Sequence, residues 1–179
     1  LLPVPATVRF VLPAAPIALD GAGTERAWWH IDPDAAGDRR DQIPVGLAAA
    51  RAQVDALLDQ LEAAGPQRIV LGGFSQGAML AVDVALQRAR PLAGLAVLSG
   101  TRIDGAAWRA GIGRARGLPV LISHGTADDV LPVAEASALR DQLRAAGAEV
   151  TWVEFPGGHT LADETVAQLA QLIARVAAP

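Results

Sequence analysis

The pentapeptide Gly73-Phe74-Ser75-Gln76-Gly77 has the residue types and spacing that can perform covalent chemistry. An apolar run at 68–72 precedes it, and a helix-like stretch at 78–82 follows it. A strand that turns at once into a helix strains its middle residue, and small residues two before and two after let the backbones approach closely. The pattern predicts a nucleophile elbow, with Ser75 as nucleophile and the backbone N–H of Gln76 as an oxyanion donor.

A serine hydroxyl is a weak nucleophile, so Ser75 needs a base within reach and a carboxylate to orient that base. Asp128 lies in the loop that leaves the expected strand 119–123, and His159 lies in the loop that leaves the expected strand 150–155. In a parallel sheet both loops open at the same edge as the elbow. The order Ser, Asp, His along the chain is that of α/β hydrolases. We therefore predict that Asp128 is the acid and His159 the base.

Each of these assignments has an alternative in ordinary structure. Asp128 can be a turn or helix-capping carboxylate, and its neighbour Asp129 competes as the acid or caps the following helix. His159 can be a solvated loop histidine. His30 and His124 precede the acid in the chain, so we interpret both as structural, with His124 shaping the acid loop.

Composition excludes several classes of function. The net charge of -4 is spread without blocks, so we expect no nucleic-acid binding. No apolar run approaches the roughly 20 residues of a membrane-spanning helix, so we expect no stable membrane insertion. The chain has no Cys, and its three His lack metal-ligand spacing, so no metal is expected. Absence of Cys suits a reducing compartment, which favours a cytoplasmic location.

The elements that must position these residues alternate between strands and helices. We expect strands at 8–12, 68–74, 92–99, 119–123 and 150–155. We expect a long loop at 14–44, a short helix within 101–116, and longer helices at 45–64, from the elbow to about 88, from about 132 to 146, and at 161–176. This alternation predicts a parallel, doubly wound α/β sheet in a single domain.

The sequence resembles the phospholipase/carboxylesterase family of α/β hydrolases, in the branch that includes acyl-protein thioesterases. The resemblance implies an α/β-hydrolase-type, mainly parallel sheet with helices on both faces. It matches Ser75, Asp128 and His159 to the family's nucleophile, acid and base, and the N–H of Gln76 to one oxyanion donor. The matching segments cover nearly the whole chain in order: Val8-Arg9-Phe10-Val11-Leu12-Pro13 with Ala15-Pro16, Arg26-Ala27-Trp28-Trp29, Gly72-Gly73-Phe74-Ser75-Gln76-Gly77-Ala78, Leu98-Ser99-Gly100, His124-Gly125-Thr126-Ala127-Asp128 and Gly158-His159.

One part of the family's pattern is missing. The family carries an upstream strand ending in a His-Gly-Leu-Gly-like turn, whose backbone N–H completes the oxyanion hole, and this sequence begins after that point. In the family's sheet that strand lies between the strands matching 8–12 and 68–74. We therefore expect a single α/β-hydrolase domain over 1–179 that is N-terminally truncated, lacking its first strands. An open strand edge of this kind favours a homodimer.

The resemblance implies hydrolysis of small-molecule carboxylic esters or thioesters through an acyl-enzyme, without metal or organic cofactor, as in carboxylesterases, lysophospholipases and acyl-thioesterases. Trp28, Trp29, Met79 and Trp108 are candidate walls for an acyl chain, and equally candidates for core packing. The alternative from another class is a catalytically incompetent fragment that acts only as an α/β interaction module. A peptidase or lactonase on the same scaffold is a second enzymatic alternative.

Overall fold

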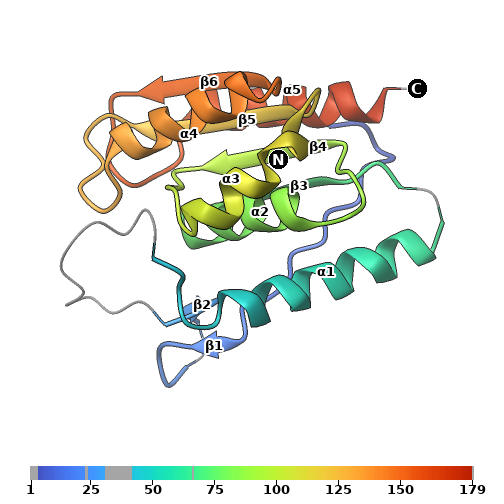
Figure 1. The fold of residues 1–179 in the computed structure, drawn as a ribbon, viewed down its shortest axis with the longest axis horizontal. Helices are drawn as coiled ribbons and strands as arrows, with labels where there is room; N and C mark the ends of the chain where they lie inside the picture. The colour runs from blue at the N-terminus through green and yellow to red at the C-terminus, as the bar shows by residue number, and fades with distance from the viewer. Residues whose placement is uncertain (1–3, 23, 31–41, 66, 179) are drawn as a thin grey trace.

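The computed structural model describes residues 4–22, 24–30, 42–65 and 67–178. Its centre is a parallel sheet in the order β3-β4-β5-β6 (Figure 1). The strands are β3 Val70–Phe74, β4 Gly94–Leu98, β5 Pro119–Gly125 and β6 Glu149–Phe155. Because all four run in the same direction, their carboxyl ends lie along one edge of the sheet, where sites gather in open α/β folds.

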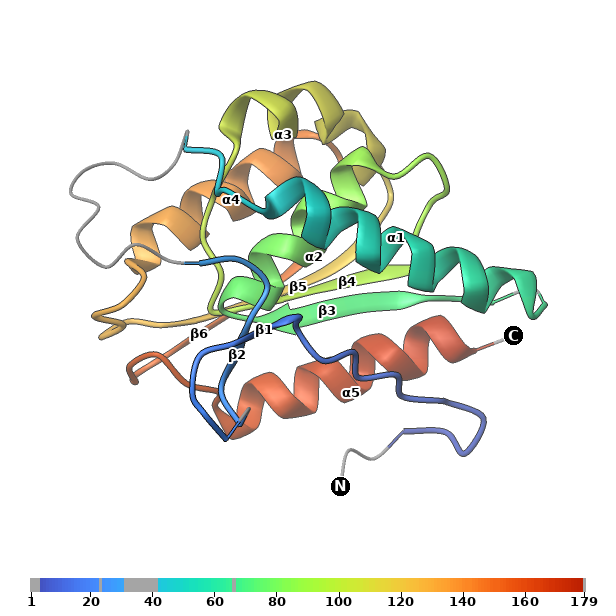
Figure 2. The ribbon, with the colours of Figure 1, turned by 90° about the horizontal axis from the view of Figure 1, so that it is seen from below.

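Helices cover both faces of this sheet. Figure 2 shows α1 and α2 on one side of β3, β4 and β5, and α5 on the other. The helices are α1 Leu47–Ala63, α2 Gln76–Gln87, α3 Gly105–Gly111, α4 Val133–Ala145 and α5 Asp163–Ala177, with a 3₁₀ turn η1 at Ile112–Ala115. The expected α/β-hydrolase-type sheet with helices on both faces is confirmed.

Strand β4 shows how the core is divided between the two faces. Leu95 and Val97 belong to a large apolar cluster with residues of α1, α2, α3 and α4. Ala96 and Leu98 belong to a smaller cluster with residues of α5. Alternate side chains of one strand point to opposite faces, so a strand that is apolar throughout is buried on both sides.

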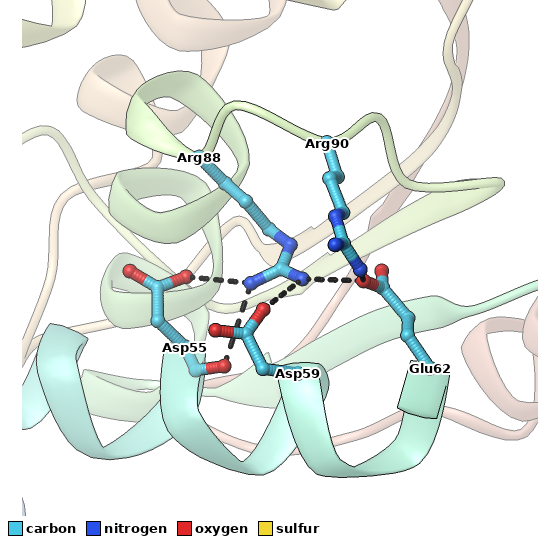
Figure 3. A network of polar contacts seen from close by, with 5 residues as sticks. All are labelled: Asp55, Asp59, Glu62, Arg88 and Arg90. Atoms are coloured by element: carbon cyan, nitrogen blue, oxygen red, sulfur yellow. Dashed lines mark hydrogen bonds and ion pairs between the residues drawn. The ribbon is translucent and has the colours of Figure 1, made fainter. Parts of the chain in front are cut away.

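Helix α1 is held against α2 by a buried guanidinium, shown in Figure 3. The Arg88 side chain, 5% exposed, donates to carboxylates of Asp55, Asp59 and Glu62 on α1 at 3.1, 2.9 and 2.9 Å. Burial alone would lower the pKa of Arg88, but these carboxylates outweigh it and raise the pKa above its ordinary value. Exposed Arg90 adds a second cation to Glu62.

The expectation of a strand at 8–12 is wrong. The N–H of Val8 donates to the Pro5 carbonyl in a turn at 3.0 Å, and Phe10, Val11 and Leu12 are exposed. Apolar residues form a stable strand only where a neighbouring strand pairs with their backbone. In the described ranges no strand pairs with 8–12, and β3 has β4 as its one neighbour in the sheet.

The other expected elements are confirmed within a few residues of their boundaries. The loop expected at 14–44 contains a small antiparallel pair that the sequence analysis missed, β1 Ile17–Ala18 and β2 Arg26–Ala27. The part of that loop at 31–41 lies outside the described residues.

Candidate active site

Ser75 sits at a sharp turn between β3 and α2. Its φ of 54° and ψ of -118° lie in a region that residues with a side chain rarely adopt. The Ser75 N–H donates to the Leu98 carbonyl of β4 at 2.8 Å, which ties the turn to the sheet. Ser75 is also the N-cap of α2, where a serine hydroxyl ordinarily bonds to the first helical turn. Here the hydroxyl makes no capping bond.

A chain of hydrogen bonds links the hydroxyl of Ser75 to a buried carboxylate. His159 Nε2 lies 2.8 Å from Ser75 Oγ, and His159 Nδ1 lies 2.8 Å from Asp128 Oδ2. Because an ionised carboxylate only accepts, Nδ1 carries the hydrogen, and Nε2 is left to accept from the serine hydroxyl. This arrangement can pass a proton from Ser75 to His159. The Phe74 ring packs on the imidazole, with centroids 4.8 Å apart.

The carboxylate of Asp128 is buried and accepts hydrogen bonds from several protein donors. Burial raises its pKa, but the backbone N–H of Leu131, the imidazole of His159 and the backbone N–H of Val130 outweigh burial and lower the pKa below its ordinary value. The two N–H groups reach Oδ1 at 2.8 and 3.0 Å. Asp128 thus accepts hydrogen bonds from the backbone of its own turn, as a turn carboxylate does, and also faces His159. Its competitor Asp129 is exposed and makes no cap to α4.

The loop after β6 crosses the ends of two strands to bring His159 to Ser75. At the end of β5, a Cβ on Gly125 would lie 2.3 Å from the carbonyl oxygens of Gly157 and Gly158, so only glycine permits this crossing. At the end of β4, Ser99 Oγ donates to the Thr160 carbonyl at 3.1 Å. Ser99 is fully buried and has a φ of 48°. Ser99 is a supporting residue that the sequence analysis did not assign.

A family model described as phospholipase/carboxylesterase matches residues 4–177. The chain belongs to the phospholipase/carboxylesterase family. A probable carboxylesterase of rice (Oryza sativa subsp. japonica) is 31% identical over 163 residues, which is 88% of this chain and 60% of the rice protein. An acyl-protein thioesterase 1 of Neurospora crassa is 29% identical over 165 residues, which is 86% of this chain and 67% of that protein.

The crystal structure of esterase PE8 is also similar to this chain. It has a TM-score of 0.78 and 29% identity, and the match covers 92% of this chain and 76% of the esterase. The present chain thus spans about three fifths to three quarters of the length of these three proteins.

In the present chain the side chain of Gln76 has a role that the sequence analysis did not anticipate. Its Oε1 accepts the N–H of Trp28 at 2.7 Å, and its Nε2 donates to the carbonyl of Trp29 at 2.9 Å. The indole nitrogen of Trp28 lies 3.9 Å from the position of a Cβ at Gly77. Gln76 therefore fixes the segment that places Trp28 beside the elbow, while its own N–H lies at the start of α2, where no intrahelical acceptor exists.

The other three candidate wall residues are buried in the core. Met79 and Trp29 pack in the large apolar cluster. Trp108, 3% exposed, donates its indole N–H to the buried carboxylate of Asp83 at 2.9 Å. Asp83 is eight residues after Ser75 on α2, or roughly 12 Å along the helix. Of the four candidate wall residues, Trp28 is therefore the one that is both next to the elbow and partly exposed.

Other features lie away from Ser75. A cavity of about 220 Å³ is lined by the first residues of β5 and β6 and by α5. It opens at the amino ends of the strands, opposite to the elbow. In the described ranges no cluster of three or more His, Asp or Glu is placed to hold a metal ion, and no helix there is long and apolar enough to cross a membrane. His30 is exposed.

Proposed function

We propose that this protein is a serine hydrolase that cleaves small-molecule carboxylic esters or thioesters through an acyl-enzyme intermediate on Ser75. The observation that carries the proposal is the hydrogen-bond chain from Asp128 through His159 to Ser75 Oγ, with 2.8 Å at each step. The similarity to a probable carboxylesterase and to an acyl-protein thioesterase supports the choice of ester and thioester substrates.

In the first half-reaction His159 Nε2 takes the Ser75 hydroxyl proton as Oγ attacks the acyl carbon. The resulting imidazolium is stabilised by the Asp128 carboxylate at Nδ1. When the tetrahedral intermediate collapses, the imidazolium returns its proton to the departing alcohol or thiol. The acyl group then remains on Ser75 as an ester.

In the second half-reaction a water molecule replaces the leaving group. His159 takes a proton from this water as it attacks the acyl-enzyme, and then returns the proton to Ser75 Oγ as the carboxylic acid departs. No metal ion or organic cofactor enters either step. The same three residues therefore serve both half-reactions.

The negative charge that develops on the substrate oxygen needs donors that are already in place. The N–H of Gln76 is the donor that we assign, because it lies at the N-terminus of α2 directly after the nucleophile. The side chain of the same residue holds Trp28 beside Gly77. We propose that Trp28 is one wall of the acyl-chain site.

The proposal is tested by exposing the purified chain to a fluorophosphonate probe and measuring the intact mass. We expect one adduct in the wild-type chain and in Ser137→Ala, a serine of α4 away from the elbow, and none in Ser75→Ala. Ester and thioester kinetics on the same three proteins then compare the two substrate classes. Absence of an adduct on a wild-type chain that unfolds cooperatively would contradict the proposal, and would favour an interaction module that uses the edge of β3.

A further inference from the structure

The end of β4 contacts both the segment of the nucleophile and the segment of the base. The Leu98 carbonyl, on the last residue of the strand, accepts the N–H of Ser75 at 2.8 Å. The next residue, Ser99, donates its hydroxyl to the Thr160 carbonyl at 3.1 Å, one residue after His159. Two consecutive residues therefore tie the nucleophile and the base to the same strand end.

The loop that carries His159 is fixed on both sides of this residue. Before it, the N–H of Ala127 in the acid loop donates to the Gly157 carbonyl at 2.9 Å. After it, the hydroxyl of Ser99 donates to the Thr160 carbonyl. The first bond joins two backbone groups, whereas the second uses a side chain. The second anchor can therefore be removed by a substitution that leaves every backbone group in place.

Ser99 is itself held firmly in place. It is fully buried, and its N–H donates to the Ser123 carbonyl of β5 at 2.8 Å. Its φ of 48° lies in the left-handed region, which residues with a side chain rarely adopt. The next residue, Gly100, lies so close to α2 that a Cβ there would be 2.7 Å from the Cβ of Ala78. The neighbouring strand and helix thus fix the backbone from which Ser99 reaches the loop.

We propose that Ser99 is a positioning residue that keeps His159 within hydrogen-bond reach of Ser75. This inference rests on the proposed function. In the two half-reactions His159 takes a proton first from the Ser75 hydroxyl and then from water, and such a transfer needs heavy atoms roughly 2.6–3.2 Å apart. A misplacement of about 1 Å can lower the rate roughly 100-fold. The Ser99 bond restrains such a displacement, because it acts on the residue next to the base.

The neighbouring strand β5 offers a matched control. Ser123 is also fully buried, but its hydroxyl has no hydrogen-bond partner among the residues that the structure describes. Ser123→Ala therefore removes a buried hydroxyl without a bond, and it keeps the carbonyl that accepts the Ser99 N–H. Ser99→Ala removes a buried hydroxyl together with its bond to the Thr160 carbonyl. Ser99→Gly also removes that bond, but it relaxes the positive φ, because glycine adopts this region readily.

The test measures kcat and KM on a short-chain p-nitrophenyl ester, with kcat divided by the fraction of protein that fluorophosphonate labels at completion. We expect kcat and kcat/KM to fall together by about 10-fold or more in both Ser99→Ala and Ser99→Gly, with KM unchanged. We expect Ser123→Ala to keep the wild-type values. In urea denaturation, Ser99→Gly should be at least as stable as Ser99→Ala. Activity would then follow the hydroxyl and not the stability of the fold.

An unchanged kcat in a folded Ser99→Gly variant, or an equal fall of kcat in Ser123→Ala, would overturn this inference and leave the proposed function intact. A wild-type chain that does not label would instead remove the proposed function. A second measurement applies even where neither Ser99 variant folds. In ¹H NMR spectra of the wild-type chain, we expect the Ser99 hydroxyl proton to exchange slowly with water, because it is buried and hydrogen-bonded. A rapidly exchanging hydroxyl proton would overturn the inference.

Discussion

Gly73 lies directly against the backbone of Gly77. A Cβ at Gly73 would be 2.3 Å from the Gly77 carbonyl carbon and 2.4 Å from its oxygen. A Cβ at Gly77 would meet the indole nitrogen of Trp28 at 3.9 Å, which is ordinary contact. The two glycines of the elbow therefore have different functions. Gly73 must be glycine because a Cβ there would clash with the start of the helix. Gly77 contributes only its backbone to this contact, so a Cβ at Gly77 is tolerated.

Gly73→Ala is expected to lower the free energy of unfolding by about 1–3 kcal/mol, because backbone must move to admit the methyl group. It should also abolish fluorophosphonate labelling of Ser75. Gly77→Ala is the matched control, and it should leave the free energy of unfolding unchanged or raise it by up to about 1 kcal/mol, since Gly77 lies in a helix. Chemical denaturation measures both values. Equal destabilisation by the two variants would contradict the different functions that we assign.

Trp28 and Trp108 should respond differently to substitution. Trp108→Phe removes a donor to buried Asp83, so the free energy of unfolding should fall by about 1–3 kcal/mol while the preference for acyl-chain length stays unchanged. Trp28→Ala should lower kcat/KM for long-chain esters relative to short-chain esters by roughly 10-fold, through lost apolar contact. Kinetics on p-nitrophenyl esters of two chain lengths measures the ratio. An altered ratio in Trp108→Phe would show that this residue also contacts the acyl chain.

Arg88, which is buried, and Arg90, which is exposed, both pair with Glu62 (Figure 3). Arg88→Gln should lower the free energy of unfolding by about 1–3 kcal/mol, because it removes charged hydrogen bonds from a buried guanidinium to Asp55 and Asp59 and leaves Glu62 with Arg90 alone. Arg90→Gln should cost less than about 1 kcal/mol, since the Arg90 side chain is 65% exposed. Urea denaturation of both variants measures the difference. Similar losses would mean that Arg88 is screened by solvent despite its burial.

Asp128 should make stability depend on pH in the acid range. Its pKa in the folded chain is lowered below the ordinary value of 3.8. A carboxyl group of this kind contributes stability that is present above its unfolded-state pKa and is lost as the pH falls through its folded-state pKa. The difference in free energy of unfolding between the wild type and Asp128→Asn should therefore shrink as the pH falls from about 5 to 2. A difference that is constant over this range would contradict the lowered pKa.

The local pattern of the chain was sufficient to locate most elements. Apolar runs bounded by Gly and Pro marked β3, β4, β5 and β6, and helical spacing marked α1, α4 and α5. These signals are local, because the period of apolar residues and the turn preferences of Gly and Pro act within a few residues. The same local signal failed at 8–12, where an apolar run has no strand beside it in the described part of the sheet.

The sequence by itself determined which residues follow the strand ends: Ser75 after β3, Asp128 after β5 and His159 after β6. Only the tertiary structure decided that they meet, because the hydrogen bond between His159 and Ser75 joins residues 84 positions apart. That bond depends on the strand order and on a loop that crosses at Gly125. The sequence likewise did not predict the hydrogen bond from Trp108 to buried Asp83, since the partners of a buried polar group are set by packing between segments and not by the period of the sequence around it.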